Sequence, residues 1–484
     1  MAESSVVRRN VYIDSVSLLQ VSADVLGLPG VEDAALVMAT ELNRQVLRDS
    51  GLLIGEAQVA GANDLVIAVR AADDDAAAEA LATAERLLSQ RRSSQDQRAE
   101  MHPRSLRAAH RADPDARLAV ISVPGAFAAG EARQALADGL NVFLFSDNVS
   151  LEDEVDLKHR ARERGLLVMG PDCGTAILNG VGLGFANVVR PGHIGLVGAS
   201  GTGLQELACL LHQAGEGISH AIGTGSHDLT SAVGGITTLQ ALELLRDDPR
   251  TVTIVLVSKP SDPAVAERVM EAAAATRKPV VARLIGARVT ALEGVQIASN
   301  LYYAARLAAS ARATWTGVSP EDLPRVRLRE QQRQVRGLYC GGTLCHEALA
   351  AMAEPALHQF IDFGDDQYTR GRAHPMIDPT LRNHAIVEAG GDPRVAVLLL
   401  DFILGLGAHV DPAGAALPAI REAQAKASTD GRHLTVIAHV VGTDHDPQDM
   451  ARQEATLRSA GVHLLASNYH AAVAASLLLE GVAA

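Results

Sequence analysis

The feature that constrains this chain most is a strand, a glycine-rich turn and a helix start that occur twice. Residues 192–211 read G-H-I-G-L-V-G-A-S-G-T-G-L-Q-E-L-A-C-L-L, and residues 337–348 read G-L-Y-C-G-G-T-L-C-H-E-A. A glycine turn before a helix directs amide N–H groups into a concavity, so each copy predicts a site for phosphate or carboxylate. The predicted binding residues are Ser200, Gly201, Thr202, Gly203, Gly341, Gly342, Thr343 and Leu344.

The repeat extends beyond these turns. Gly201, Thr202 and Glu206 align with residues of the second copy at an offset of 141, and apolar strands follow each copy at similar spacing. A period of about 140 residues indicates a duplicated α/β domain rather than a short repeat unit. We therefore predict flavodoxin-like domains at 191–312 and 336–484, joined by a linker at 313–335. Two helix N-termini of the same design would then face one ligand.

The preceding segment, 117–190, alternates short apolar strands with helices, which predicts a parallel, Rossmann-like sheet. Residues 1–90 read as a small α+β module of ferredoxin-like or ACT-like type, with a first strand at 7–13, and residues 91–116 read as a polar linker. We expect ligands of the parallel sheets to bind at the carboxyl ends of their strands. Gly223, Thr224 and Gly225 follow one such strand end. Their sequence fits a ligand-binding loop and a plain connection between elements equally well.

Composition excludes several classes of partner. The formal net charge is −14 and aromatic residues make up 3% of the 484 residues, which argues against a nucleic-acid surface. No run approaches the roughly 20 apolar residues of a membrane span, and the N-terminus has no apolar signal region. The four cysteines contain no C-x-x-C pair, so a reducing cytoplasm is the simplest interpretation.

Four motifs then resemble a known family. They are G-P-D-C-G-T-A-I-L-N-G, G-L-V-G-A-S-G-T-G-L-Q-E, G-G-T-L-C and D-F-G-D-D-Q-Y-T-R-G-R-A-H-P-M-I-D, in this order. The chain from 117 to 484 resembles the succinyl-CoA synthetase superfamily and, within it, the FdrA family. The resemblance implies a Rossmann-like CoA-binding-type domain followed by two synthetase-type domains. Its implied CoA-type loop residues are Pro124, Gly125, Asp172, Cys173, Gly174 and Asn179.

The FdrA family includes a subunit of a carbamoyltransferase that converts oxalurate and phosphate to oxamate and carbamoyl phosphate with two other subunits. This implies phosphate and a small carboxylate as substrates, further subunits as partners and CoA as a possible ligand; the sequence requires no other cofactor. The family also makes Arg370, Arg372 and His374 the candidate catalytic residues, because arginine suits bidentate capture of a dicarbonyl acid. A solvated charged loop is the alternative.

The chain departs from the synthetases at two points. Their phosphorylated histidine lies soon after a K-P-V-V strand, yet residues 283–297 contain no histidine. No ATP-grasp domain and no P-loop G-x-x-x-x-G-K-[ST] is recognisable, so a step with ATP would need another chain.

We expect Cys173, Cys340 and Cys345 to be packed rather than nucleophilic. Several acids and histidines invite a metal interpretation, but their spacing matches no zinc or calcium site, and we predict no metal ligand set among Asp401, His409, Asp411, Asp444, His445 and Asp446. Three functional hypotheses remain: a carbamoyltransferase subunit, an acyl-CoA synthetase and a non-catalytic ligand-sensing subunit.

Overall fold

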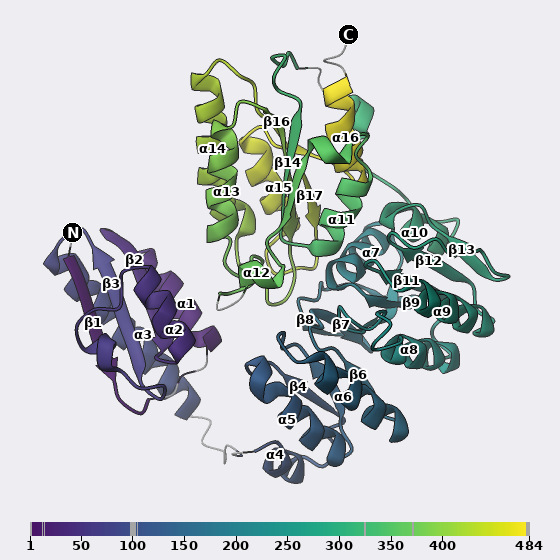
Figure 1. Ribbon diagram of the computed structural model, residues 1–484, viewed down its shortest axis with the longest axis horizontal. Helices are drawn as coiled ribbons and strands as arrows, with labels where there is room; N and C mark the ends of the chain where they lie inside the picture. The colour runs from purple at the N-terminus through teal and green to yellow at the C-terminus, as the bar shows by residue number, and fades with distance from the viewer. Residues whose placement is uncertain are drawn as a thin grey trace. The chain divides into compact units, whose positions relative to one another are not determined.

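The structure is a computed structural model that describes residues 2–11, 13, 15–96, 103, 105–323, 326–369 and 372–480. The chain forms two compact units, Met1–Pro103 and Arg104–Ala484 (Figure 1). Among the described residues, no helix is long and apolar enough to cross a membrane.

The N-terminal unit is a three-stranded antiparallel sheet packed against helices. Its central strand, β3, pairs antiparallel with both β1 and β2. Residues 65–69 of β3 are almost completely buried because α1 and α3 pack one face with apolar side chains. The elements are β1 (Ala2–Arg8), α1 (Ser15–Leu26), β2 (Val31–Met38), α2 (Glu41–Asp49), η1 (Gly55–Val59), β3 (Leu65–Ala71) and α3 (Asp74–Asp96).

The first strand differs from its prediction. It covers 2–8 rather than 7–13, because the backbone turns at Asn10, which has a φ of 53° and donates its N–H to Asp64. Because residues 11–13 are apolar, the hydrophobic pattern placed the strand too far along the chain. The resemblance of this unit to an ACT module stays a prediction.

The second unit begins with α4 and a small parallel sheet in the order β4-β5-β6. Helices α5 and α6 connect its strands, as the alternation of apolar strands and helices predicts. The elements are α4 (Leu106–Ala112), β4 (Leu118–Ile121), α5 (Gly125–Ala137), β5 (Asn141–Leu144), α6 (Leu151–Glu163) and β6 (Val168–Met169).

A seven-stranded sheet follows, in the order β13-β12-β11-β9-β10-β7-β8. Strands β9 to β13 are parallel and have the order 2-1-3-4-5 of a flavodoxin-like domain. The elements are β7 (Thr175–Leu178), β8 (Val181–Gly184), β9 (Pro191–Ala199), α7 (Gly201–Gln213), β10 (Ile218–Gly223), α8 (Ile236–Asp247), β11 (Thr253–Ser258), α9 (Pro263–Ala275), β12 (Val280–Leu284), β13 (Val295–Ile297) and α10 (Leu301–Ala308).

The hairpin β7–β8 lies within the segment 117–190 that was expected to form a separate domain. Its strand β7 pairs antiparallel with β10, so the hairpin extends the seven-stranded sheet instead. The Asn179–Gly180 turn, with φ of 53° and 82°, matches the two-residue turn that the twist of a hairpin favours.

The last sheet repeats the same order, β15-β14-β16-β17-β18, with all strands parallel. The predicted duplication is therefore visible as two sheets of one topology. The elements are η2 (Pro320–Asp322), β14 (Gln334–Tyr339), α11 (Gly342–Ala350), η3 (Pro355–Leu357), β15 (Gln359–Asp362), α12 (Asp366–Thr369), α13 (Thr380–Gly391), β16 (Val395–Ile403), α14 (Pro412–Thr429), β17 (Thr435–Val441), α15 (Met450–Ser459), β18 (His463–Leu464) and α16 (Asn468–Glu480).

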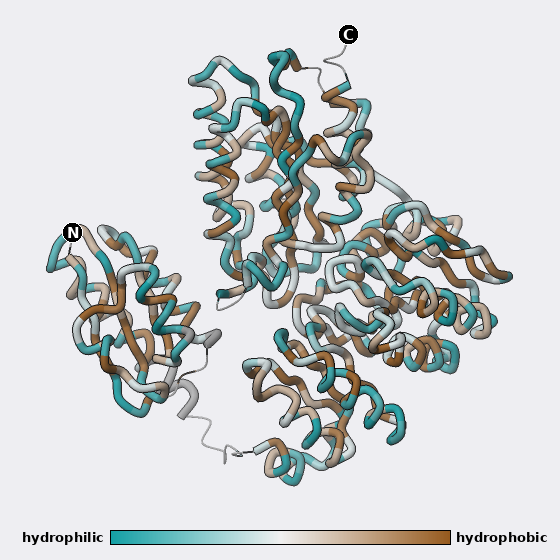
Figure 2. Tube along the Cα trace, in the orientation of Figure 1, coloured by the Kyte–Doolittle hydropathy of each residue, from teal (hydrophilic) through white to brown (hydrophobic). Residues whose placement is uncertain are grey.

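Hydrophobic residues concentrate on the strands of these sheets, and the surrounding helices alternate hydrophobic and hydrophilic residues (Figure 2). The largest cluster of buried apolar residues joins the two repeats through α7, α10, α11 and α16. This shared core fixes α7 beside α11 (Figure 1).

Candidate functional site

The first copy of the duplicated motif ends β9 and starts α7. Ser200 caps the helix from an extended conformation, and its Oγ accepts the Gly203 N–H at 3.1 Å. The N–H groups of Gly201 and Thr202, the first two helical residues, have no acceptor within the described residues. These two amides are free to bind an external anion, as the first residues of a helix generally are.

The second copy ends β14 and starts α11, but its electrostatics differ. Gly341 caps α11 without a side chain, and the carboxylate of Asp401 accepts N–H from Cys340 at 2.7 Å and from Gly341 at 2.8 Å. Asp401 is 0% exposed and pairs with Arg382 at 3.1 Å. An internal carboxylate therefore already lies at the turn that begins α11.

The two helix N-termini touch. Ser200 Oγ and Thr343 Oγ1 lie 2.6 Å apart in a direct hydrogen bond. A Cβ atom on Gly341 would lie 2.9 Å from Thr202 Cγ2, so the close approach requires glycine there. The structure thus brings together the two turns that the sequence paired, and the meeting point is the carboxyl end of both sheets, where ligands of such folds bind.

Lys259 and Asp362 end two strands at this point. Lys259 follows β11, and its Nζ lies 3.3 Å from the position that a Cβ on Gly342 would occupy; Asp362 Oδ2 would lie 2.2 Å from the same point. Burial raises the pKa of Asp362 to about 6, although the charge of Lys259 opposes the rise. A carboxyl group that titrates near neutrality beside a cation is a typical functional-site arrangement.

Of the three predicted catalytic residues, His374 belongs to this site. Its Nδ1 accepts the Met376 N–H, and its Nε2 lies 2.8 Å from the position of a Cβ on Gly364, beside Asp362. Burial lowers the pKa of His374 to about 4, so the ring is neutral at physiological pH and its Nε2–H is a donor. Arg370 lies outside the described residues, and the exposed Arg372 side chain forms no hydrogen bond or ion pair with any residue that the structure describes.

The predicted loop Gly223, Thr224 and Gly225 packs against its neighbours. A Cβ on Gly223 would lie 2.3 Å from Thr175 O, and one on Gly225 would lie 2.4 Å from Pro171 O. Buried Lys158 anchors the loop by donating to Thr224 O at 2.9 Å, Asp228 Oδ1 at 2.8 Å and Glu154 Oε1 at 2.7 Å. These glycines permit close packing, and a ligand-binding role for the loop stays a prediction.

The predicted CoA-type loop residues do not all lie together. A Cβ on Gly125, which follows Pro124, would meet Asp147 O at 2.3 Å, so this turn packs on the loop after β5. Asp172 and Gly174 lie on the loop before β7, whereas Asn179 forms the hairpin turn at the opposite end of that strand. Asn179 is therefore separated from the carboxyl-end site.

The cysteines are buried, as expected for packed thiols. Burial raises the pKa of Cys173 to about 12, and the same cause raises the pKa of Cys340 and Cys345. A thiol with a raised pKa is a poor nucleophile at neutral pH.

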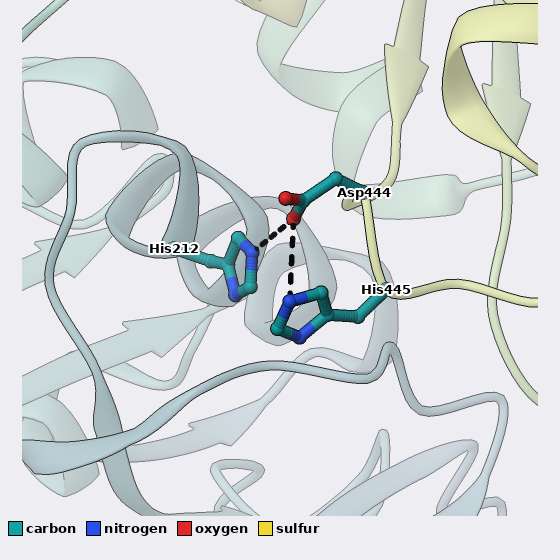
Figure 3. Close-up of side chains that lie close together, drawn as sticks. All are labelled: His212, Asp444 and His445. Carbon is teal, nitrogen blue, oxygen red and sulfur yellow. Dashed lines mark hydrogen bonds and ion pairs between the residues drawn. The ribbon is translucent and has the colours of Figure 1, made fainter.

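Figure 3 shows the one group of side chains with metal-like geometry within the described residues: His212, Asp444 and His445. His212 Nε2 lies 2.6 Å from Asp444 Oδ1, and its Nδ1 accepts the Arg190 N–H at 3.0 Å. A neutral imidazole has one lone pair, which Arg190 uses, so Nε2–H donates to Asp444 and is not free to ligate. The arrangement is an anchor between the repeats, and the prediction of no metal ligand set stays a prediction.

Behind the site, the two repeats exchange helix caps. Glu206 of α7 accepts the N–H of Asn468, the first residue of α16, and Glu347 of α11 accepts the N–H of Leu301, the first residue of α10. Each glutamate thus caps a helix of the other repeat. Glu206 also contacts His439 Nε2 at 2.8 Å, and burial raises the pKa of Glu347 to about 7.

Sequence reasoning missed several of these roles. Lys259 follows an apolar strand of a parallel sheet, and Asp362 begins the D-F-G-D-D motif, so both carried a usable signal: position at a strand's carboxyl end. Glu206 and Glu347 aligned in the repeat, but their exchanged caps depend on contacts between distant segments. Thr175 lay inside a quoted motif and carried no separate signal.

Comparisons with known proteins define the class first. A CoA-binding domain model matches residues 189–285 and a CoA-ligase model matches 338–478. These are the two sheets that carry α7 and α11, and the CoA-binding match lies one sheet further along the chain than the segment 117–190 to which we assigned that domain. The chain is thus a succinyl-CoA synthetase-like α/β protein.

The family follows from a relative over the whole chain. The Escherichia coli (strain K12) uncharacterized protein YahF is 44% identical over 504 residues, covering 97% of each chain, so this chain belongs to the YahF family. An Archaeoglobus fulgidus succinate–CoA ligase [ADP-forming] subunit alpha 2 is 30% identical over 151 residues, 30% of this chain and 51% of that protein. A Ca. Korarchaeum cryptofilum acetyl-coenzyme A synthetase structure matches with a TM-score of 0.34 at 17% identity, covering 76% of this chain and 82% of that one.

The N-terminal unit matches a third model, described as an AllF heavy metal-associated domain, over residues 1–103. Soft metal ions in such domains need thiolate ligands, yet residues 1–103 contain no cysteine and one histidine, His102, which lies outside the described residues. The residues present do not fit a thiolate metal site.

Proposed function

We propose that this protein is an acid–thiol ligase-type enzyme that transfers an acyl group between CoA and phosphate. The observation that carries the proposal is the contact of the α7 and α11 N-termini in the CoA-binding and CoA-ligase domains, with two unpaired amides on α7. Such amides bind phosphate where strands of a parallel sheet end.

In the proposed reaction, a phosphate oxygen attacks the thioester carbonyl carbon, the C–S bond breaks, and acyl phosphate and CoA thiolate result. The α7 amides hold the phosphate in line, and the neutral His374 Nε2–H donates a hydrogen bond to the carbonyl oxygen as negative charge develops. The thiolate takes a proton from solvent or from the Asp362 carboxyl group, whose pKa of about 6 allows both protonation states near neutrality.

A phosphate-dependent thiol-release assay tests the proposal. The protein is incubated with acetyl-CoA or succinyl-CoA, free thiol is measured with a disulfide reagent, and acyl phosphate is trapped with hydroxylamine. We expect thiol release to rise with phosphate and to match the acyl phosphate formed. Thiol release that does not respond to phosphate, without acyl phosphate, contradicts the proposal.

A second candidate is the carbamoyl transfer of the FdrA family, which our motif comparison favours. The absence of histidine from 283–297 supports it, because a carbamoyl transfer to phosphate needs no phosphorylated side chain. The chemistry is the same attack of phosphate on a carbonyl, but the leaving group is an amide nitrogen. Carbamoyl phosphate formed from oxalurate and phosphate, with no thiol release from acyl-CoA, would favour this candidate.

We further propose that CoA is a substrate and that the chain works with other subunits in a hetero-oligomer. The relative from Archaeoglobus fulgidus is named as an alpha subunit, which supports the second point. Tight CoA binding without turnover of any acyl-CoA or amide acid would instead favour a ligand-sensing subunit.

A further inference from the structure

We propose that Lys259 and Thr175 hold a phosphoryl group at the N-terminus of α7, the lysine by its charge and the threonine by its hydroxyl. This inference rests on the proposed function and deepens it, because it names the ligand class of the site and the two side chains that select it. Both residues were outside the predicted site.

Thr175 supplies an unpaired buried donor at the correct place. The residue is 2% exposed, and its Oγ1 has no hydrogen-bond partner. Oγ1 lies 3.5 Å from the position that a Cβ on Gly201 would occupy, so it faces the start of α7. A buried hydroxyl without a partner costs about 1–3 kcal/mol, which a ligand oxygen at this point would recover.

Lys259 is exceptional among the lysines of this chain. The chain has only four, and three of them are engaged: Lys158 with Glu154 and Asp228, Lys278 with two carbonyl oxygens, and Lys426 with Glu422. Within the described residues, no carboxylate lies within ion-pair distance of Lys259 Nζ, and no hydrogen-bond acceptor contacts it. Its charge is available to a ligand.

The position of Lys259 places that charge between the two turns. Its Nζ lies 3.3 Å from the position of a Cβ on Gly342, the first residue of α11, where the Asp362 carboxylate also lies. Its charge also acts across the site: it opposes the rise in the pKa of Asp362, at the end of β15, and of Asp172, on the loop that precedes Thr175. Gly341, the neighbour of Gly342, contacts Thr202 of α7, so the ammonium group lies at the junction of the two helix starts.

The donor set favours a phosphoryl group over a carboxylate. Two amides of α7, the Thr175 hydroxyl and the Lys259 ammonium point to one region, and a tetrahedral phosphoryl group offers three oxygens with more than one negative charge. A carboxylate offers two coplanar oxygens and one charge, and would leave a donor unmet.

Lysine labelling tests the proposal without requiring turnover. Pyridoxal 5′-phosphate forms imines with accessible lysines, borohydride fixes them, and peptide mass spectrometry measures each site. We expect inorganic phosphate at about ten times its Kd to reduce labelling of Lys259 about tenfold, while labelling of exposed Lys426 in the same sample stays within about twofold. Equal labelling of Lys259 with and without phosphate overturns the proposal.

Calorimetry with inorganic phosphate on variants of the full chain provides the second readout. We expect Lys259→Met and Thr175→Val each to weaken phosphate binding about 10- to 100-fold, as for loss of a hydrogen bond to a charged group, whereas Lys259→Arg and Lys426→Met bind within about threefold of the original chain. Circular dichroism and thermal melting verify folding, and a Lys259→Met chain that folds and binds phosphate normally contradicts the inference.

The two tests separate this inference from the proposed function. Phosphate that protects Lys259 without any acyl-CoA turnover would uphold the inference and remove the function. Phosphate-dependent thiol release that persists unchanged in Lys259→Met would do the reverse.

Discussion

The starts of α7 and α11 derive from one duplicated motif, yet a buried carboxylate binds the turn before only one of them. At α11, Asp401 accepts two turn N–H groups and Asp362 lies over Gly342. At α7, the equivalent strand supplies no carboxylate: Val257 packs there, and Ser200 Oγ alone caps the helix. A buried carboxylate therefore lies at the turn before α11 and none at the equivalent position before α7, whereas the first amides of both helices, Gly201 and Thr202 in α7 and Gly342 and Thr343 in α11, have no acceptor within the described residues.

The difference shows how a duplication becomes an asymmetric site. Two identical anion sites in contact would repel one another when both were filled, because two charges a few Å apart interact strongly away from bulk water. At α11 the internal carboxylate of Asp401 is paired with the Arg382 guanidinium, so it repels an external anion at α7 less than a second external anion would. Lys259, which follows β11 of the first repeat, places its Nζ at the start of α11 in the second repeat.

The largest effect should follow removal of the internal anion. Asp401→Asn leaves the Arg382 guanidinium, 2% exposed, without a counter-charge, so we expect the free energy of unfolding to fall by about 3–5 kcal/mol in urea titrations. The control is Glu422→Gln, which breaks an exposed pair with Lys426 and should change stability by less than about 1 kcal/mol. Equal effects of the two substitutions would mean that α11 does not depend on its buried carboxylate.

The next effect concerns the exchanged caps and depends on pH. Burial raises the pKa of Glu347 to about 7, above the ordinary value of 4.5 for a glutamate, so the folded chain keeps a proton that the unfolded chain releases. Stability should therefore fall as pH rises from about 5 to about 7, by up to about 3 kcal/mol. Burial lowers the pKa of His439, but the charge of the Glu206 carboxylate outweighs burial, so the pKa of His439 is raised. The stability that this pair contributes is therefore also lost as the pH rises.

Glu347→Gln should flatten this dependence. Urea unfolding at pH 5, 6 and 7 on the original and variant chains measures the slopes, and the His439 contribution should remain in both. A variant that keeps the full slope would show that Glu347 does not carry the proton.

A smaller effect should follow crowding of the α7 turn. A Cβ on Gly203 would lie 2.3 Å from Ser200 Oγ, so Gly203→Ala must displace the cap, and we expect a loss of about 1–3 kcal/mol together with weaker phosphate binding. Gly130 of α5 has open space at its Cβ position, and Gly130→Ala should stabilise the chain by about 0.5–1 kcal/mol. Thermal melting with and without phosphate compares the two variants.

The smallest effect should come from the cap itself. Ser200→Ala removes one N-cap hydrogen bond and the partner of Thr343 Oγ1, and we expect a stability loss of about 1 kcal/mol. The difference between the stability losses caused by Ser200→Ala and Asp401→Asn measures how differently the two helix N-termini are stabilised. A loss from Ser200→Ala as large as that from Asp401→Asn would remove the asymmetry.

Much of the fold was predictable because it follows from local pattern. The alignment of Gly201 and Thr202 with Gly342 and Thr343 identified the duplication, and the α/β class of both sheets is confirmed. The pairing of the two turns was predictable for the same reason, since equivalent strand ends of two copies tend to form one site. The Ser200–Thr343 hydrogen bond shows that the two turns meet, and their binding of one ligand stays a prediction.

What could not be predicted depends on contacts between distant segments. The hairpin ending at Asn179 joins the seven-stranded sheet only because β7 meets β10, and Glu206 caps α16 only because the repeats pack together. Lys259 carried one signal, its position at the carboxyl end of β11, which it shares with every other residue that follows a strand of these sheets. The grouping of Arg370, Arg372 and His374 came from family resemblance, and of these the structure places only His374 beside the site.

The most direct test of the central claim is the position of the bound anion. A crystal structure of the full chain with arsenate, a phosphate analogue, would locate the ion by the anomalous scattering of arsenic. The account predicts an arsenic peak within hydrogen-bonding reach of the Gly201 and Thr202 amides, with oxygens towards Thr175 Oγ1 and Lys259 Nζ. A peak at the start of α11 in place of α7, or the absence of a peak at α7 at saturating arsenate, would contradict it.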